Sequence, residues 1–505
     1  MTALNTNARI AVIGAGAMGA GIAQVAAQAG HPVLLLDNRP GAAAQAIDGI
    51  DRQLVKRVEK GKLSDEARKA TVSRLEAVEA IEALADCELI IEAIVENLEV
   101  KRALFRQLEG ICGEHCILAS NTSSLSITSI AAQLSHPQRL LGLHFFNPAP
   151  VMALVEIVSG LASDPALAEC LYDTANAWGK KPVHTRSTPG FIVNRVARPF
   201  YAESLRLLQE GVADCATLDA LMREAGGFAM GAFELTDLIG HDVNYAVTCS
   251  VFDAYYGDTR FLPSLIQKEL VEAGRLGRKS GHGFYNYAEG AERPLPTFIS
   301  SKQTVATCTA EGDLGIANAL IQRLRKHRID VIQRDGQGLL RVGDAVLALS
   351  DGRMAGQRAK EDGLRNLILL DLVADFGQST RIAISCSAGI SPDALEHGVA
   401  LLQQGGFTVS LLSDSPALAV LRTVAMLANE AADAVLQGVA SATDIDLAMR
   451  AGVNYPQGPL AWADAIGPAH ILNVLEYLQA SYGEERYRPS LLLRRRVAEG
   501  RTFHD

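Results

Sequence analysis

Arg9-Ile-Ala-Val-Ile-Gly14-Ala-Gly-Ala-Met-Gly19 passes without interruption from an apolar run into a glycine-rich turn. Small residues fill positions 20–29, and Val33-Leu-Leu-Leu36 is a second apolar run. This order predicts a strand, a tight turn, a helix and another strand, the context in which spaced glycines indicate a dinucleotide site. The chain is therefore expected to begin with an α/β domain of the Rossmann type.

Each glycine of the turn has its own expected task. Gly14 allows the tight turn, Gly16 lets the backbone approach a pyrophosphate at the helix N-terminus, and Gly19 lets the helix pack on the strand. Met18 belongs to the same turn and is expected to contact the cofactor. Asp37 closes the second apolar run, where it can bind the adenosine ribose hydroxyls and would repel a 2′-phosphate. This favours NAD over NADP.

Other features near the turn leave alternatives open. Arg39 weakens the preference for NAD, and a ligand-free turn or a FAD site is the alternative to an NAD site. The apolar run 89–95 precedes Glu96 and Lys101, and strand ends at this edge of a doubly wound sheet face the cofactor. Both residues are candidate cofactor contacts, although the same spacing is typical of a solvated helix start. Residues 47–82 are expected to be helical.

Composition limits the classes of protein to which the 505-residue chain can belong. It has 48% hydrophobic and 21% charged residues, and its formal charge of −10 argues against nucleic acid as a partner. No apolar run reaches the roughly 18 residues of a membrane span, and the N-terminus lacks a signal-peptide pattern. A cytoplasmic protein without a membrane partner is expected. Cys112 and Cys116 have no second pair to complete a zinc site, so no metal is expected.

A second group of polar residues points to chemistry at an alcohol. It comprises the hydroxyl of Ser123, the imidazole of His144, the amide of Asn147 and the carboxylate of Glu156. Oxidation of an alcohol needs a base, and histidine suits this role because its pKa lies near working pH. Two strands joined by a turn would bring His144 and Glu156 together, as a base and the carboxylate that fixes its tautomer. Ser123 and Asn147 are otherwise ordinary turn or cap residues.

Four motifs in one order resemble the L-3-hydroxyacyl-CoA dehydrogenases. They are Ser120-Asn-Thr-Ser-Ser-Leu125, Gly142-Leu-His-Phe-Phe-Asn-Pro148, Leu154-Val-Glu-Ile-Val158 and Thr188-Pro-Gly-Phe-Ile-Val-Asn-Arg195. The resemblance covers about residues 8–287 almost without interruption. It implies a two-domain enzyme that oxidises a 3-hydroxyacyl-CoA to the 3-ketoacyl-CoA with NAD.

The resemblance also implies roles for individual residues. His144 is the implied base, Glu156 its partner, Ser123 a contact of the substrate oxygen, and Asn194 a residue that positions substrate and histidine. Beyond the glycine turn, the implied cofactor contacts are Asp37, Glu96, Lys101, Ser123, Asn147 and Lys279. Lys60 matches a family lysine that contacts the CoA moiety. Gln53 stands where the family has a serine, which leaves the grip on CoA less defined.

Residues 188–240 are repeated at 415–467, with a constant offset along the chain. The spaced apolar residues and loop glycines predict helices in both copies. Asn194 is replaced by Leu421 in the second copy, and the motif around Lys279 is absent there. We expect the second copy to keep its packing and lose its chemistry, within an internal pseudo-dimer or a homodimer. The segment Ser120–Glu156 shows no duplicate, so one active centre per chain is expected.

The region between the helical copies resembles neither of them. Strands are expected at 345–350, 367–371, 381–385 and 407–412, and helices at 316–333 and 392–404, which predicts a small α/β module. A scaffold or spacer is the favoured role, with a second ligand site as the alternative. The expected organisation is a Rossmann domain at 1–187, an all-α domain at 188–290, the α/β module at 300–412 and a second, degenerate all-α domain at 413–505.

Several substrates are compatible with this pattern. Length and duplication resemble the long bacterial 3-hydroxyacyl-CoA dehydrogenases of phenylacetate breakdown, which act on 3-hydroxyadipyl-CoA. A 3-hydroxybutyryl-CoA or a free hydroxy acid is the alternative substrate. A further hypothesis is a non-catalytic structural protein that retains NAD binding, against which the intact Ser123, His144, Glu156 and Asn194 count.

Overall fold

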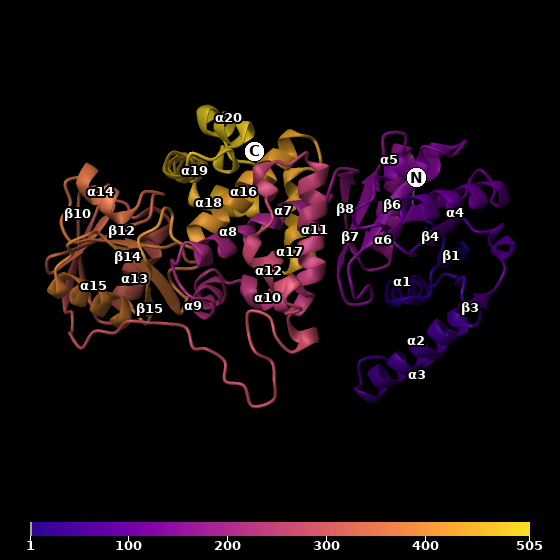
Figure 1. Ribbon diagram of the computed structural model, residues 1–505, viewed down its shortest axis with the longest axis horizontal. Coiled ribbons are helices and arrows are strands. Elements are labelled where there is room, and N and C mark those ends of the chain that lie inside the picture. The colour runs from indigo at the N-terminus through magenta and orange to yellow at the C-terminus, as the bar shows by residue number, and fades with distance from the viewer. Residues whose placement is uncertain (1–2) are drawn as a thin grey trace. The chain divides into compact units, whose positions relative to one another are not determined.

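The computed structural model describes residues 3–505 and divides into two compact units (Figure 1). The first unit comprises the chain up to Arg195 together with Gln437–Val453, and the second comprises Val196–Leu436 with Asn454–Asp505. These units follow packing, so the four domain boundaries expected from the sequence stay a prediction.

An eight-stranded sheet forms the centre of the first unit, in the order β3-β2-β1-β4-β5-β6-β7-β8. All neighbours are parallel except β6 and β7, which are antiparallel. The strands are β1 (Ile10–Ile13), β2 (Val33–Leu36), β3 (Leu75–Val78), β4 (Leu89–Glu92), β5 (Ile117–Ser120), β6 (Leu140–Phe145), β7 (Leu154–Ser159) and β8 (Lys181–Arg186). The expected Rossmann-type sheet is confirmed.

Helices of this unit lie over two separate apolar cores. Successive residues of a strand point to opposite faces, so Ile10 and Val12 join one core with Ile22. Ala11 and Ile13 join the other core with Phe105. The helices are α1 (Ala17–Gln28), α2 (Ala42–Glu59), α3 (Asp65–Val72), α4 (Leu98–Ile111), α5 (Ile127–Ala131), α6 (Pro165–Ala177), α7 (Val193–Val196) and α17 (Ala442–Val453).

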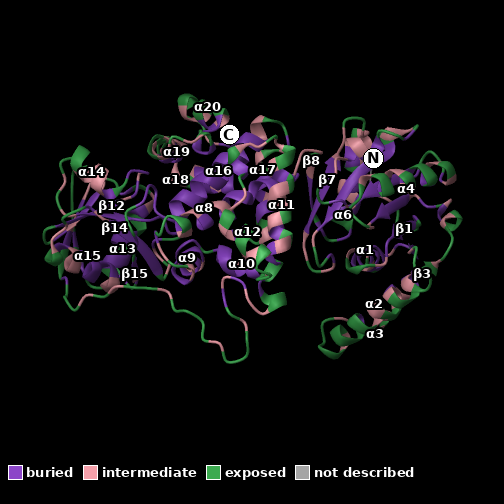
Figure 2. Cartoon of the chain, viewed as in Figure 1, coloured by how far each residue is buried: buried purple, intermediate pink, exposed green. Residues whose placement is uncertain are grey.

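Residues 47–82, expected to be helical, contain a strand as well as helices. Strand β3 follows α3 and pairs with β2 at the edge of the sheet. Only Leu75 of its four residues is buried, so the strand lacks the apolar run that marks the inner strands. Figure 2 shows how much of α2 and α3 is exposed, and α2 buries only Ala43, Ile50 and Leu54.

Helices from both sequence copies share the core of the second unit. Helix α16 (Val420–Leu436) is buried along almost its whole length and packs on α8 and α18. Its buried charged residues are paired, Arg422 with Glu203 and both Glu430 and Asp433 with Arg260. The other helices are α8 (Arg198–Gln209), α9 (Cys215–Ala220), α10 (Ala232–Ile239), α11 (His241–Ala254), α12 (Leu265–Glu272), α18 (Pro459–Ile466), α19 (Pro468–Tyr482) and α20 (Leu491–Glu499).

A second sheet of seven strands belongs to the same unit, in the order β10-β9-β11-β12-β13-β14-β15. Its strands are β9 (Thr307–Glu311), β10 (Asp330–Arg334), β11 (Leu339–Val342), β12 (Ala345–Leu349), β13 (Leu367–Leu370), β14 (Arg381–Cys386) and β15 (Thr408–Leu411). Its helices are α13 (Asn318–Lys326), α14 (Ala355–Glu361) and α15 (Pro392–Gln404). All four expected strands are confirmed, and β9, β10 and β11 were not expected.

The helix expected at 316–333 is wrong in its second half. Helix α13 ends at Lys326, and Arg328 adopts a left-handed backbone with φ of 64°, which a continuing helix does not allow. The residues that follow form β10, an edge strand in which only Val331 is buried. In the sequence, Val331 falls where the apolar face of a longer helix would continue. The backbone leaves the helical conformation before this residue, so the sequence pattern was misleading here.

The internal repeat also includes four neighbouring strands of each sheet. In the first unit β5-β6 is parallel, β6-β7 antiparallel and β7-β8 parallel. In the second unit β12-β13, β13-β14 and β14-β15 repeat this pattern. Pro392 opens α15 as Pro165 opens α6, at the same offset as in the helical copies. The expectation that 120–156 has no duplicate is therefore wrong, because the fold is repeated there although the side chains are not.

Each unit contains a helical segment contributed by the other sequence copy. Helix α17 packs on β7 and β8 in the first unit, where the N–H of Arg186 donates to the carbonyl of Val439. In the second unit, the π-helical turn Leu221–Ala225 packs on β14. The offset of the repeat matches α17 to the segment 215–225 and β14 to β7, so the two contacts are counterparts of one another.

Candidate active site

The strand pair β6 and β7 brings the expected base and carboxylate together. His144 lies opposite Glu156 in the antiparallel register, and its Nδ1 is 2.6 Å from Oε2 of Glu156. The exposed fractions are 6% for His144 and 0% for Glu156. Phe146 and Phe191 lie against the imidazole, with ring centroids 4.5 and 5.8 Å from it. The expected pairing is confirmed as geometry, whereas its catalytic role stays a prediction.

The free side of the imidazole is its Nε2 atom. A carboxylate on Nδ1 fixes the tautomer in which Nδ1 carries the proton, so Nε2 is an acceptor. Across residues 3–505, no protein group hydrogen-bonds to Nε2 of His144. The nitrogen can therefore accept a proton from a bound ligand.

The second oxygen of Glu156 is tied to the start of α7. Its Oε1 accepts hydrogen bonds from the backbone N–H groups of Ile192 and Val193, at 3.0 and 3.1 Å. A buried carboxylate is stabilised by such donors, so the orientation of the dyad depends on this chain segment. Asn194, the expected positioning residue, is the next residue of the same helix and is half-buried.

Glu96 organises the serine-rich loop that contains Ser123. Its Oε1 accepts from the Thr122 hydroxyl at 2.6 Å, from the backbone N–H of Ser123 at 3.1 Å, and from the N–H and hydroxyl of Ser124 at 3.2 and 3.0 Å. Burial alone would raise the pKa of Glu96, but the Thr122 hydroxyl and the charge of Lys101 outweigh it and lower the pKa. Ser123 itself is exposed.

A buried ion pair supports this loop from below. Nζ of Lys101 lies 2.5 Å from Oε1 of Glu92 and 3.3 Å from Oε2 of Glu96, and the Ser120 hydroxyl donates to the other oxygen of Glu92. Lys101 is 1% exposed, so the structure places it beneath Glu96, and direct contact with a cofactor stays a prediction. Sequence reasoning missed Glu92, although a carboxylate ending an apolar strand was a usable signal.

The glycine turn has the geometry that a dinucleotide requires. Gly14 has φ of +103°, and a Cβ there would lie 2.4 Å from the carbonyl oxygen of Ala93. A Cβ on Gly19 would lie 1.7 Å from the carbonyl oxygen of Gly14, whereas one on Gly16 would meet nothing within 4 Å. No side chain caps the N-terminus of α1. Its first-turn N–H groups therefore fit a pyrophosphate, next to the half-buried Met18.

Asp37 lies at the end of β2 and connects to the turn. Its Oδ2 accepts from the N–H of Ala15 at 2.7 Å, and its Oδ1 accepts from the N–H and Nε of Arg39 at 2.9 and 3.0 Å. Partial burial acts to raise the pKa of Asp37. The hydrogen bonds from Arg39 and Ala15 have the larger, opposite effect, so the pKa lies below its usual value. The carboxylate is therefore charged and placed for ribose hydroxyls.

Lys279 lies in the second unit, on the loop that follows α12. Its Nζ forms an ion pair with the carboxylate of Asp242, at 2.5 Å from Oδ1. Both side chains are partly exposed, at 44% and 41%. The ion pair keeps the ammonium at the N-terminal end of α11, and the expected cofactor contact of Lys279 stays a prediction.

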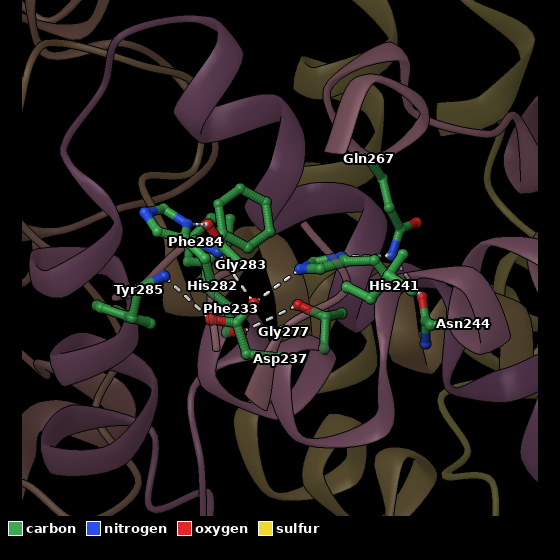
Figure 3. A network of polar contacts seen from close by, with 12 residues as sticks. Phe233, Asp237, His241, Asn244, Gln267, Gly277, His282, Gly283, Phe284 and Tyr285 are labelled. Atoms are coloured by element: carbon green, nitrogen blue, oxygen red, sulfur yellow. Dashed lines mark hydrogen bonds and ion pairs between the residues drawn. The ribbon is translucent and has the colours of Figure 1, made fainter. Parts of the chain in front are cut away.

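A buried network fixes the loop that carries Lys279 (Figure 3). Oδ1 of Asp237 lies 2.7 Å from Nε2 of His241 and accepts from the N–H of Phe284, and Oδ2 accepts from the N–H of Tyr285. Asp237 and His241 are fully buried. Gly277 and Gly283 also pack directly against Asp237, where a Cβ on either would clash. Sequence reasoning missed this anchor because its members are 47 residues apart.

The remaining expected contacts lie at the surface of the first unit. Lys60 caps the C-terminal end of α2 and is exposed, as is Gln53. Asn147 is exposed in the turn between β6 and β7, where it precedes a cis peptide bond to Pro148. The structure thus groups His144, Glu156 and the residue before Asn194 by direct contact, and leaves Lys60 and Asn147 without such contacts.

The counterpart positions in the second unit differ in every reactive side chain but one. At the offset of the repeat, Asp371 matches His144, Ala383 matches Glu156, Leu421 matches Asn194 and Ser350 matches Ser123. The carboxylate of Asp371 accepts from the N–H groups of Ala419, Val420 and Leu421. Glu156 binds the backbone N–H groups at the start of α7 in the first unit, and Asp371 binds the matching N–H groups in the second unit. Because Asp371 takes the position of His144, the second unit has no imidazole there.

A Rossmann-type sheet with a glycine turn, an acidic ribose position and a His–carboxylate pair defines the class of NAD-dependent dehydrogenases. Three family models match the chain. The NAD binding domain of 3-hydroxyacyl-CoA dehydrogenase matches residues 9–188, its C-terminal domain matches 190–287 and 419–503, and the reduced Rossmann-fold domain of 3-hydroxybutyryl-CoA dehydrogenase matches 347–416. The chain belongs to the 3-hydroxyacyl-CoA dehydrogenase family and uses NAD.

Relatives match the chain over its full length or over its first part. A 3-hydroxyadipyl-CoA dehydrogenase of Escherichia coli (strain K12) is 49% identical over 97% of both chains. A probable 3-hydroxybutyryl-CoA dehydrogenase of Bacillus subtilis (strain 168) is 41% identical over 56% of this chain and 98% of its own length. A crystal structure of a 3-hydroxybutyryl-CoA dehydrogenase from Escherichia coli K12 has 47% identity and a TM-score of 0.89, covering 98% of this chain and 99% of that chain.

These matches confirm the enzyme class, the cofactor and the fold expected from the sequence. The small α/β module expected at 300–412 agrees with the match of a reduced Rossmann-fold domain to residues 347–416. In the part of the chain that the structure describes, no helix is both long and apolar enough to span a membrane.

Proposed function

We propose that the chain oxidises the 3-hydroxyl group of an L-3-hydroxyacyl-CoA, with His144 as the base that accepts the hydroxyl proton. The observation that supports this most is the 2.6 Å contact between Nδ1 of His144 and Oε2 of Glu156. The carboxylate holds the proton on Nδ1, presents Nε2 as the acceptor, and stabilises the imidazolium that forms. NAD bound at the glycine turn supplies the acceptor for the hydride that leaves the same carbon.

Two further residues complete the proposed centre. Ser123 donates its hydroxyl hydrogen bond to the substrate oxygen, on a loop that Glu96 holds through three neighbouring residues. Asn194 positions the substrate and the histidine, because it follows Val193, whose N–H fixes Glu156. These donors act where charge develops on the substrate oxygen, which is where such groups contribute most to catalysis.

The proposed contacts with the cofactor and with CoA are the following. In the first unit, the turn at Gly14, Gly16, Met18 and Gly19 holds the pyrophosphate, and Asp37 binds the adenosine ribose. Glu96, Lys101, Ser123 and Asn147 serve the nicotinamide half, with Lys101 acting through Glu96. Lys279 is a further proposed cofactor contact through its positive charge, and Lys60 is proposed to bind the CoA phosphates.

The acyl group of the substrate is proposed to be 3-hydroxyadipyl, with 3-hydroxybutyryl as the alternative. The first is the substrate in the name of the full-length relative from Escherichia coli. The second is the substrate in the names of the full-length crystal structure and of the shorter Bacillus subtilis relative. NADH formation with butyryl-, hexanoyl- and adipyl-chain 3-hydroxyacyl-CoAs decides between them through kcat/KM. Free hydroxy acids serve as the third arm, and turnover confined to them would refute a CoA-thioester substrate.

The dyad is tested with a matched pair of histidine variants. His144→Ala should lower kcat by roughly two to four orders of magnitude, the usual contribution of a general base, while the Kd of NADH stays nearly unchanged. His184 is the control because it lies 3.5 Å from Glu169 on the exposed face of β8, so His184→Ala should keep full turnover. Wild-type kcat in His144→Ala would exclude this residue as the base.

We further propose that one chain is an internal pseudo-dimer with a single active centre, and that it works in the cytoplasm. The reciprocal packing of α17 on β7 and of the turn Leu221–Ala225 on β14 supports the first point. All eight cysteines are free thiols, which suits a reducing compartment. Sedimentation of the full chain measures its state, and titration with NADH measures the number of sites. Two NADH molecules per chain would refute the single centre.

A further inference from the structure

The second unit contains a cavity of about 460 Å³ that the proposed chemistry does not use. Its walls come from α8, α11, the segment 260–267 and residues 482–487 of the second sequence copy. All of these belong to the second unit. Cavities of this size hold small organic ligands. Four arginines line it, namely Arg198, Arg206, Arg260 and Arg486.

Three of the four guanidinium groups are neutralised by neighbouring carboxylates. The ion pairs are Arg206 with Glu203, Arg260 with Glu430 and Asp433, and Arg486 with Glu484. The charges of these three guanidinium groups are therefore already balanced within the protein, and the pairs of Arg260 also join the two helical copies.

Arg198 is the exception. It is 5% exposed, its Nη1 donates to the hydroxyl of Thr248 at 3.0 Å, and its guanidinium lies 4.9 Å from the ring centre of Tyr201. No carboxylate within residues 3–505 forms an ion pair with it. Burial lowers its pKa. An unpaired buried cation is costly, and an oxyanion in the cavity would supply the missing counter-charge.

The internal repeat shows that the helical fold does not require a cation here. At the offset of the repeat, Arg198 and Tyr201 are matched by Ala425 and Ala428, which are buried in α16. Arg206 is matched by Asp433 in the same way. The repeated helix thus packs with small apolar residues where the first copy has a guanidinium and a phenol. The unpaired guanidinium of Arg198 therefore has no counterpart in the second copy.

We propose that this cavity binds an organic monocarboxylate, whose carboxylate pairs with Arg198 and whose apolar body lies against Leu205 and Phe261. One unpaired cation matches one negative charge. Glu210 and Glu484 also line the cavity, but each is already paired with an arginine, Arg422 and Arg486 respectively. The lining therefore offers no second unpaired cation for another anionic group, which disfavours dicarboxylates and phosphate. The buried hydroxyl of Ser264 has no hydrogen-bond partner in the described chain and offers a further donor.

Calorimetric titration of the full-length protein without NAD or acyl-CoA tests the proposal. Acetate, butyrate, hexanoate, adipate and inorganic phosphate are the probes. Affinity should rise about fourfold per methylene group from acetate to hexanoate, the usual gain for burial of one CH2, with adipate and phosphate weaker than hexanoate. Arg198→Gln should raise the Kd of hexanoate ~10- to 100-fold, as loss of a charged hydrogen bond does. Arg275→Gln, at an exposed position of the same unit, should leave it unchanged.

Two further variants locate the binding site. Ala202→Phe places a ring in the cavity from α8 and should abolish hexanoate binding even if Arg198→Gln does not fold. His144→Ala should bind hexanoate as the wild type does, because the proposed site is separate from the dehydrogenase centre. Absence of hexanoate binding to the wild type, binding unchanged in both cavity variants, or phosphate binding at least as tight as hexanoate would each overturn the proposal. None of these results depends on turnover.

Discussion

Gly452 offers a direct test of whether the second sequence copy supports the pair of His144 and Glu156. It is the penultimate residue of α17, and a Cβ added to it would lie 2.5 Å from Cδ2 of Leu154 and 3.3 Å from Cγ2 of Val193. Leu154 lies two residues before Glu156 on β7, and the N–H of Val193 donates to Glu156. Gly452→Ala therefore presses on both elements that hold the carboxylate of Glu156.

The expected size follows from two opposing effects. Overpacking of a buried contact costs ~1–3 kcal/mol, whereas replacing glycine by alanine inside a helix stabilises by about 1 kcal/mol. Gly110 separates the two effects. It is also the penultimate residue of its helix, α4, but a Cβ there meets nothing within 4 Å, so its replacement by alanine shows the helix effect without overpacking. We expect Gly110→Ala to stabilise and Gly452→Ala to destabilise, with a difference of ~1–3 kcal/mol between the variants.

Urea unfolding measures this difference, and steady-state kinetics measure its consequence for the dyad. Gly452→Ala should lower kcat while leaving the Kd of NADH close to that of the wild type, since α17 packs on β7 and β8, which lie at the other end of the sheet from β2 and are separated from β1 by β4, β5 and β6. Gly110→Ala should keep the wild-type kcat. The reasoning fails if Gly452→Ala is as stable as Gly110→Ala and has an unchanged kcat.

Three further outcomes are expected. Asp37→Ala should lose the preference for NAD over NADP by at least tenfold in kcat/KM, because the carboxylate no longer excludes a 2′-phosphate; an unchanged ratio would contradict its role. Asp237→Asn should raise the KM for NAD and weaken protection of the Lys279 loop in hydrogen exchange, since four donors bind this carboxylate in the wild type, and wild-type exchange there would contradict the anchor. Burial raises the pKa of Asp371 to about 6, above its ordinary value of 3.8, so its contribution to stability is present below pH ~4 and is lost as the pH rises through 6. Asp371→Asn should therefore flatten the fall in unfolding free energy between pH 4 and 6, measured by urea unfolding, and an unaltered slope would count against this assignment.

The part of the fold that could be predicted was the part with strong local signals. The apolar run before Gly14 marked β1 and the turn, because buried parallel strands are apolar along their whole length. Pro392 and the apolar spacing after it marked α15 to the residue. The edge strands β3 and β10 each bury one residue and gave no such run. Their existence depends on pairing with a neighbour that is distant in sequence.

The candidate site divides in the same way. His144 and Glu156 were predictable as a pair because twelve residues and one turn separate them. Glu92 and Asp237 were not, because their roles depend on partners 28 and 47 residues away. The repeat at 344–412 escaped detection because its fold is kept by strand pairing and burial, while His144 and Glu156 are replaced by Asp371 and Ala383.

The contribution of α17 to the first unit has a consequence for dilution. In a dimer of separate chains, a helix supplied by a partner is lost when the protein concentration falls below the dissociation constant. Here the helix is joined to the unit that it supports by the same polypeptide, so its effective concentration is set by the connecting chain, of the order of millimolar for short flexible connections. Specific activity should therefore remain constant down to the lowest enzyme concentration at which NADH formation can be followed.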